Sequence, residues 1–326
     1  MPAIAFALAV GALFAQDEAP RIVDPKASGI DLLPGVLGPG DRQAVATTDN
    51  AGQPVIGRIH ARVGEGAVVL LPDGQLVGRS SDGFLPTDRP FVPVEKDVLA
   101  RRLAVEFAGF KTKQTNHYVY VFDTSDEFAL TASRILETML SGVKAYGESQ
   151  RIEVAEPEVP LVVVMFRTEE EFQKHSRFPD GVVAYYHTLS NRVYMYEQSR
   201  LAKVRPNLAI QQAIATIAHE GAHQILHNIG VQQRLSVWPM WLSEGLAEYF
   251  APTSTGARLR WKGAGQVNDL RMFELEQYLH SRAADEPDGR TIEETVMAER
   301  LSSTGYASAW AMTHYLAKHR RTEFNQ

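Results

Sequence analysis

The chain of 326 residues contains no cysteine. This absence excludes disulfide bonds, thiolate zinc sites, iron–sulfur clusters, a cysteine nucleophile and a lipid-bearing cysteine near the N-terminus. A basic excess is also missing, because the formal net charge is −6, and we therefore expect no nucleic-acid partner. Beyond the N-terminal segment no stretch approaches 18 apolar residues, so we expect no stable membrane span in the mature chain. The hydrophobic fraction of 44% is ordinary for a chain with a buried core and excludes wholesale disorder.

The N-terminus carries one uninterrupted apolar run. Residues 3–15 read AIAFALAVGALFA and are followed at once by the polar Gln16-Asp17-Glu18. A run of this length is too short to cross a hydrocarbon core of about 30 Å as a helix, but it fits the apolar region of a secretory signal. We therefore predict a signal peptide over residues 1–15 and export to the periplasm or the extracellular space. No basic residue precedes the run, so a buried N-terminal strand or helix is the alternative.

The residues that follow divide into two stretches of different composition. Residues 16–45 are rich in proline, glycine and aspartate and predict a linker. Residues 46–93 contain short alternating runs that predict a small β module, and their spacing resembles the SH3-like modules found beside bacterial exported enzymes. No cluster of catalytic residue types lies there, so we expect a packing or interaction role. The predicted strands cover residues 55–63, 67–71 and 75–78.

From residue 94 onwards, strand and helix patterns alternate and then give way to helices. We expect one domain over residues 94–326, with a sheet followed by a run of helices, which makes an α+β fold. Helix starts are expected near Ser125 and at Thr168, which is followed by three glutamates that suit a helix N-terminus. The predicted strands cover residues 118–122 and 161–166 and a hairpin over 182–196, and helical periodicity dominates after Pro206.

The strongest chemical signal is His219-Glu220-Gly221-Ala222-His223, a match to H-E-x-x-H. It lies in residues 208–229, where apolar positions recur every three to four residues as in a helix. Residues i and i+4 lie one turn apart on one helix face, so both imidazoles can reach one metal ion. Glu220 could then take a proton from a water on that metal as general base, and zinc lowers the pKa of such a water towards about 7. The alternative is a helix whose two histidines are satisfied by hydrogen bonds in the core.

A third ligand has several candidates. His227 lies a further four residues along, but successive four-residue steps drift around a helix, so three such ligands converge poorly. A metzincin would need histidine at the position of Ile229, and the inverted motif is absent. Glu244 is the better candidate, because it lies in a second helical segment, residues 241–250, that can fold back beside the first. Two histidines and one glutamate leave the fourth position open, as in catalytic zinc sites.

The pair H-E-x-x-H and Trp241-Leu242-Ser243-Glu244-Gly245-Leu246-Ala247-Glu248-Tyr249-Phe250 resembles the gluzincin metallopeptidases. It is most similar to the peptidase-MA-like domains of bacterial exported proteins, and the motifs cover roughly residues 205–252. The resemblance implies a zincin-like fold with a mixed sheet and active-site helices. It also implies Zn²⁺ held by His219, His223 and Glu244, with Glu220 as catalytic base. Aminopeptidase-N-like members usually have asparagine where this chain has Ser243, a difference outside the ligand set.

Two further side chains are candidates for supporting roles. Glu248 lies one turn beyond Glu244 and could accept the N–H of a ligating histidine or bind a substrate amine, or it could be a solvated glutamate. Tyr306 lies in a later helical stretch, and its phenol could donate to a developing oxyanion, or it could be ordinary core. Tyr185, Tyr186 and His187 on the predicted hairpin are rival cleft-lining groups.

These signals together predict a zinc-dependent peptidase that hydrolyses peptide or protein substrates by metal-activated water, with a glutamate as general base. Two alternatives stay open. In one, the fold acts as a catalytically weak or inactive binding or scaffolding protein. In the other, the zinc site hydrolyses a non-peptide amide or ester.

Overall fold

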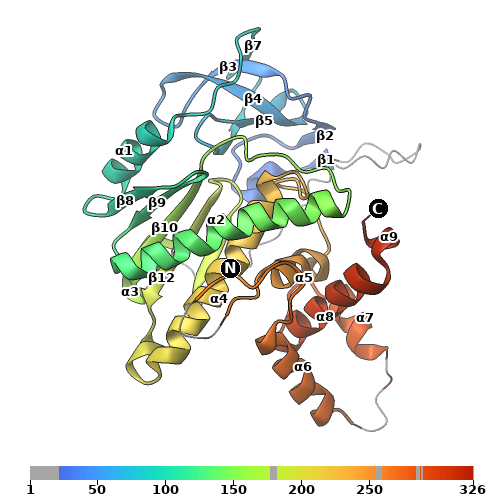
Figure 1. Ribbon diagram of the computed structural model, residues 1–326. Helices are drawn as coiled ribbons and strands as arrows, with labels where there is room; N and C mark the ends of the chain where they lie inside the picture. Colours follow the sequence, from blue (N-terminus) through green and yellow to red (C-terminus); the bar gives the residue numbers. More distant parts are fainter. Residues whose placement is uncertain (1–21, 177–181, 255–258, 284–286, 288, 326) are drawn as a thin grey trace.

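In the computed structural model, which describes residues 22–176, 182–254, 259–283, 287 and 289–325, the chain is an α+β protein built on two sheets (Figure 1). The first sheet belongs to the N-terminal part of the chain and the second to the following part, with helices dominating the C-terminal part. The α+β class predicted from the sequence is therefore confirmed. The predicted signal peptide, residues 1–15, lies outside the described residues.

The first sheet contains seven strands and forms the upper part of the molecule in Figure 1. We call it the N-terminal β module, residues 22–86. Its centre is β4 (Pro54–Val63), because this long strand pairs with β2, β3 and β5. The other elements are β1 (Ile22–Val23), the short 3-10 helix η1 (Pro25–Ser28), β2 (Gly35–Pro39), β3 (Ala44–Thr48), β5 (Gly66–Leu70), β6 (Leu76–Arg79) and β7 (Leu85–Pro86).

The linker predicted over residues 16–45 is wrong for its described part, residues 22–45. Strand β2 pairs with β4, and Ile30 and Leu32 are buried in the core of the module. The glycines of this stretch serve close packing between strands: a Cβ added at Gly35 would lie 2.7 Å from the backbone nitrogen of Gly64. A composition typical of linkers here reflects tight strand contacts.

The second sheet is mixed, in the order β11-β12-β10-β9-β8. Strands β9, β10 and β12 run parallel, and the two edge strands β8 and β11 are antiparallel to their neighbours. Alternation along β9 places Tyr118 and Tyr120 in one core and Val119 and Val121 in the other. The strands are β8 (Lys111–Gln114), β9 (Tyr118–Phe122), β10 (Leu161–Thr168), β11 (Ala184–His187) and β12 (Arg192–Gln198), so the strands and the hairpin predicted for this region are confirmed.

Helices cover both faces of this sheet. Helices α1 (Lys96–Glu106) and α3 (Glu169–Ser176) pack on one face, and α2 (Asp126–Ser149) and α4 (Pro206–Asn228) pack on the other. The predicted helix starts are correct: Ser125 Oγ accepts a hydrogen bond from Phe128 N at 3.2 Å, and Thr168 Oγ1 accepts one from Glu171 N at 3.3 Å.

The C-terminal helices pack beside α4, at the lower right of Figure 1. Helix α5 (Met240–Phe250) contacts both α4 and α8 (Ser303–His319), and α6 (Asp269–Ser281) packs on α8. Helix α7 (Arg290–Met297), helix α9 (Arg321–Phe324) and the 3-10 helix η2 (Arg200–Lys203) complete the described elements. None of the described helices combines the length and the apolar composition that crossing a bilayer would require.

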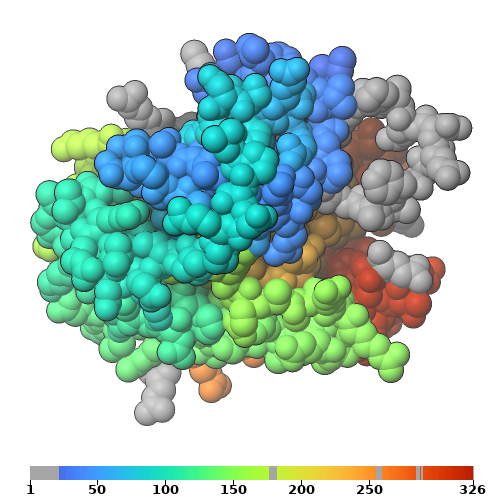
Figure 2. All heavy atoms as spheres, turned by 90° about the horizontal axis from the view of Figure 1, so that it is seen from above, coloured from blue at the N-terminus to red at the C-terminus, as the bar shows by residue number. Residues whose placement is uncertain are grey.

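The N-terminal β module is bonded directly to the rest of the chain. Figure 2 shows its atoms (blue to cyan) over the centre of the face seen from above, with the C-terminal helices (red) to one side. Leu76 N donates to Leu189 O at 2.8 Å, and Arg234 Nη1 donates to Gly74 O at 2.7 Å. His60 Nε2 lies 2.8 Å from Arg234 O. The module therefore shares a hydrogen-bonded interface with the turn between β11 and β12 and with the loop after α4.

Candidate metal centre

The H-E-x-x-H segment lies on α4, where it has a buried side and a side that faces α5. Ala218 and Ala222 are fully buried in the core. Gly221 allows close packing on α2, because a Cβ there would lie 2.2 Å from the side chain of Leu136. The rings of His219 and His223 lie on the other side, with centroids 4.9 Å apart. Small residues inside the motif thus let α4 pack closely against the core while both imidazoles face Glu244 of α5.

Helix α5 brings the distant glutamate to these rings. Glu244 Oε2 lies 3.0 Å from His219 Nε2 and 3.4 Å from His223 Nε2. Next to it, Gly245 lets α5 approach α8, because a Cβ at that position would lie 2.7 Å from Ala309 O. One ligand atom from each of the three residues lies within 4.8 Å of the others. His219, His223 and Glu244 are therefore a group that could hold a metal ion.

The surroundings of Glu244 keep its carboxylate ionised. Burial raises the pKa of Glu244, but the two neighbouring imidazoles outweigh it and hold that pKa well below its usual range. Each imidazole has a lone pair on one nitrogen when neutral, so two nitrogens and one carboxylate oxygen converge as Lewis bases. This donor set fits zinc, and it also accommodates other divalent transition metals.

His227 does not belong to the group, in agreement with the expected drift around the helix. Its ring instead stacks on Tyr186, with centroids 5.5 Å apart and an interplanar angle of 24°. Burial lowers the pKa of His227 to about 3. His227 is therefore a neutral core histidine.

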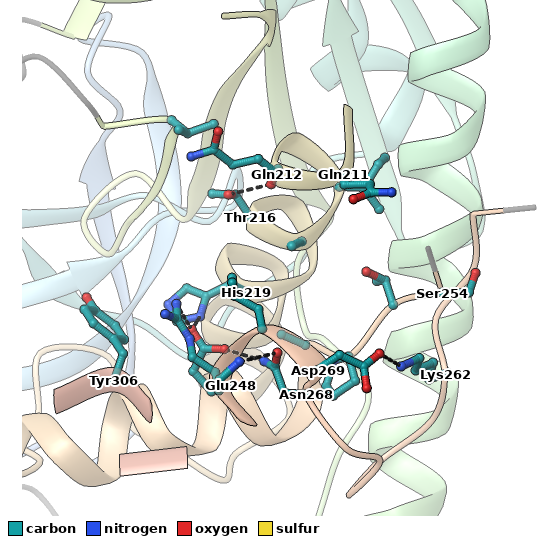
Figure 3. Close-up of a pocket in the computed structure, with 18 of the residues that line it drawn as sticks. Gln211, Gln212, Thr216, His219, Glu248, Ser254, Lys262, Asn268, Asp269 and Tyr306 are labelled. Atoms are coloured by element: carbon teal, nitrogen blue, oxygen red, sulfur yellow. Dashed lines mark hydrogen bonds and ion pairs between the residues drawn. The ribbon is translucent and has the colours of Figure 1, made fainter. Parts of the chain in front are cut away.

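Glu248 lies one turn after Glu244 and contacts the other side of His219. Its Oε1 lies 3.1 Å from His219 Nδ1. Arg271 Nη2 donates to the same oxygen at 2.8 Å, and Asn268 Nδ2 donates to Oε2 at 2.7 Å. Figure 3 shows Glu248 beside His219 and Asn268. Burial raises the pKa of Glu248, but His219 and Arg271 outweigh it and lower the pKa to about 2. Glu248 is therefore buried, ionised and close to His219, so it is not a solvated glutamate.

The side chain of Glu220 points towards strand β11, whereas those of His219 and His223 point towards α5. Its Oε2 accepts a hydrogen bond from Tyr186 N at 2.8 Å, so the edge strand β11 holds the carboxylate. Burial raises the pKa of Glu220, and His219 and His223 oppose that shift. Glu220 also lines a cleft of about 730 Å³ that His219 and Glu248 border. A carboxylate with a raised pKa beside a cleft is suited to accept and return a proton.

Tyr306 of α8 lines the same cleft and lies near the group. Its ring centroid is 6.1 Å from that of His219, and the Arg271 guanidinium lies 5.1 Å from the tyrosine ring centroid. Burial raises the pKa of Tyr306, and nearby carboxylates raise it further, so the phenol keeps its proton. The rivals Tyr185, Tyr186 and His187 are not among the described residues that line the cleft.

Three parts of the site escaped the sequence interpretation. Asn268 and Arg271, which hold Glu248, come from the start of α6, and the Tyr186 N–H belongs to the backbone. Asn268-Asp269 before a helical run is a recognisable cap signal, and Asn268 Oδ1 does accept from Arg271 N at 3.3 Å. A cap signal, however, does not reveal what the other end of the amide touches.

Comparison with known sequences gives one finding. The sequence model of a family described as "Protein of unknown function (DUF1570)" matches residues 213–326. This segment is about a third of the chain and includes His219, His223, Glu244 and Tyr306. No curated protein matches the chain in sequence. The likeness thus covers the candidate metal centre and the C-terminal helices, and it assigns no activity.

Proposed function

We propose that the chain is a zinc-dependent peptidase of gluzincin type. The observation that carries the proposal is the convergence of two imidazoles from α4 and one carboxylate from α5, with Glu220 beside them at a cleft. His219, His223 and Glu244 would hold the zinc. When bound to such ligands, zinc lowers the pKa of a water molecule and polarises the carbonyl that is attacked.

The chain's own residues have distinct roles in the proposed hydrolysis. Glu220 accepts a proton from the attacking water as its oxygen forms a bond to the carbonyl carbon. It then returns that proton to the amide nitrogen as the carbon–nitrogen bond breaks, so one water is consumed and two peptide ends are released. The Tyr186 N–H holds one carboxylate oxygen of Glu220 throughout. Tyr306 can donate its phenol proton in a hydrogen bond to the developing oxyanion.

The proposal is tested with a library of fluorogenic peptides and the zinc-loaded protein, comparing the natural chain with Glu220→Gln. We expect the substitution to lower the hydrolysis rate by at least about 100-fold, because glutamine cannot accept the proton. Zinc content should stay unchanged, since Glu220 is not a ligand. Glu276→Gln, at an exposed position of α6, is the matched control and should cleave normally.

Two results would contradict the proposal. Equal rates for the natural chain and Glu220→Gln would mean that any cleavage comes from a contaminant or another site. Zinc binding without cleavage of any peptide would favour the binding or scaffolding alternative. A screen of non-peptide amides and esters then separates that alternative from a hydrolase with another substrate.

A further inference from the structure

The first turn of α6 is built around the carboxylate of Glu248. Its N-cap residue Asn268 donates to one oxygen at 2.7 Å, and Arg271, one turn later, donates to the other at 2.8 Å. Glu248 is buried, with a side chain only 5% exposed. Its Oε1 also faces His219 Nδ1 at 3.1 Å. Both oxygens of one buried carboxylate are therefore held by a single helix start.

We propose that Asn268 and Arg271 are positioning residues for the metal centre, acting on His219 through Glu248. This inference rests on the proposed zinc site. A carboxylate fixed 3.1 Å from Nδ1 favours the tautomer with its proton on that nitrogen. The lone pair of Nε2, which lies beside Glu244, would then be free to bind a metal ion. A glutamate side chain has several rotamers, and the two donors select the one that reaches the imidazole.

Arg271 is itself held in place from two further sides. Its Nη1 donates to Glu274 Oε2 at 2.6 Å, and its guanidinium lies over the ring of Tyr306. A planar guanidinium with partners on both ends cannot be replaced by a lysine, which offers a single charged group. The start of α6 thus connects the cleft wall, the tyrosine and the partner of a metal ligand.

The chain offers a variant that separates this role from helix capping. In Asn268→Asp the side chain still caps α6, because aspartate accepts the hydrogen bond from Arg271 N as well as asparagine does. It loses the amide donor and places a second carboxylate against Glu248. Arg271→Met removes the guanidinium and keeps much of the side-chain length. Arg320→Met, at an exposed position near the C-terminus, is the matched control.

The measurement is zinc affinity by competition with a chelating dye, with circular dichroism and thermal unfolding of the zinc-free proteins alongside. We expect Asn268→Asp and Arg271→Met to weaken zinc binding by about 10-fold to 100-fold, the usual effect of losing a partner of a metal-bound histidine. Arg320→Met should bind as the natural chain does. In a Glu248→Gln background, adding Arg271→Met should weaken zinc binding by less than a further factor of about 2, because Arg271 is proposed to act on His219 only through Glu248.

Failure of the zinc site and failure of the positioning role of Asn268 and Arg271 give different results. If the natural chain binds no zinc, the proposed function fails. If it binds zinc and both variants bind equally well, the positioning role of α6 is overturned and the zinc site stands. An undiminished effect of Arg271→Met in the Glu248→Gln background would also overturn it, since the effect would not pass through Glu248.

Discussion

His219 is held between two carboxylates, with Glu244 facing its Nε2 and Glu248 facing its Nδ1. Glu220 is a further carboxylate nearby, and Arg271 donates to Glu248. Burying several carboxylates together is unfavourable unless cations or donors compensate them. Without a metal, His219 can supply part of this compensation, because burial lowers its pKa but Glu248 and Glu244 outweigh that effect and raise it. In the proposed zinc site, a divalent cation held by His219, His223 and Glu244 would supply it instead.

His60 supports a prediction about pH that is independent of the metal centre. Burial lowers its pKa from 6.5 to about 4 in the folded chain. Between these two values the unfolded chain binds the proton and the folded chain does not, so the stability that neutral His60 provides is present above pH 6.5 and is lost as the pH falls towards 4. We expect His60→Gln to lose less stability than the natural chain when urea unfolding is compared at neutral and mildly acidic pH.

His280→Gln provides the control for this titration, because His280 is exposed on α6. It should show the same dependence on pH as the natural chain. An unchanged pH dependence in His60→Gln would show that His60 does not resist protonation in the folded state.

Arg234 joins the N-terminal β module to the second sheet through hydrogen bonds to both. It lies in the loop after α4 and is buried, with 6% of its surface exposed. Its guanidinium donates to Gly74 O of the module and to Thr188 O and Leu189 O of the turn between β11 and β12. Strand β11 then presents the Tyr186 N–H to Glu220. Arg234 thus fixes the turn after β11, the strand whose Tyr186 N–H holds Glu220, the proposed base.

Removing the guanidinium of Arg234 should destabilise the fold. Arg234→Met removes the side-chain donors to Gly74 O and Thr188 O, at about 1–3 kcal/mol for each group left unsatisfied. We expect the midpoint of thermal unfolding to fall by at least about 5 °C, measured by calorimetry. Arg320→Met should leave the midpoint unchanged. If Arg234→Met lowered the unfolding midpoint no more than the control does, the stabilising role of Arg234 would be contradicted.

The strands, helices and caps of the second sheet follow from local pattern, whereas contacts between distant elements do not. Ser125 and Thr168 carry their capping signals in the sequence, β9 contains only aromatic and aliphatic residues, and β10 is apolar over residues 161–166. The partners of Arg234 are backbone carbonyls, which no residue type reveals. Asn268 and Arg271 contact Glu248 only because α6 begins beside α5. The composition of residues 22–45 resembles that of a linker, but glycine and proline also occur where strands pack closely. Composition alone therefore could not distinguish the two.

The N-terminal β module and the following part share a core, so we expect them to unfold together. Leu189 and Leu235 come from the later part of the chain and pack into the core of the module. A chain that begins at residue 94 would expose this apolar surface and lose the donors and acceptors of the interface. We expect it to unfold at a clearly lower temperature than the full chain, or to aggregate. Equal melting temperatures and equal zinc binding would show that the two parts are independent.

Helices α4 and α5 bring His219, His223 and Glu244 together as a group that could hold one metal ion. The most direct test is the metal content of the purified protein after dialysis against zinc, determined by inductively coupled plasma mass spectrometry for the natural chain, His223→Ala, Glu244→Ala and the exposed control Glu276→Ala. We expect about one zinc per chain in the natural protein and the control, and none above background in the two ligand variants, since two ligands do not complete a zinc site. A natural chain without zinc, or ligand variants that keep it, would contradict the proposed zinc site.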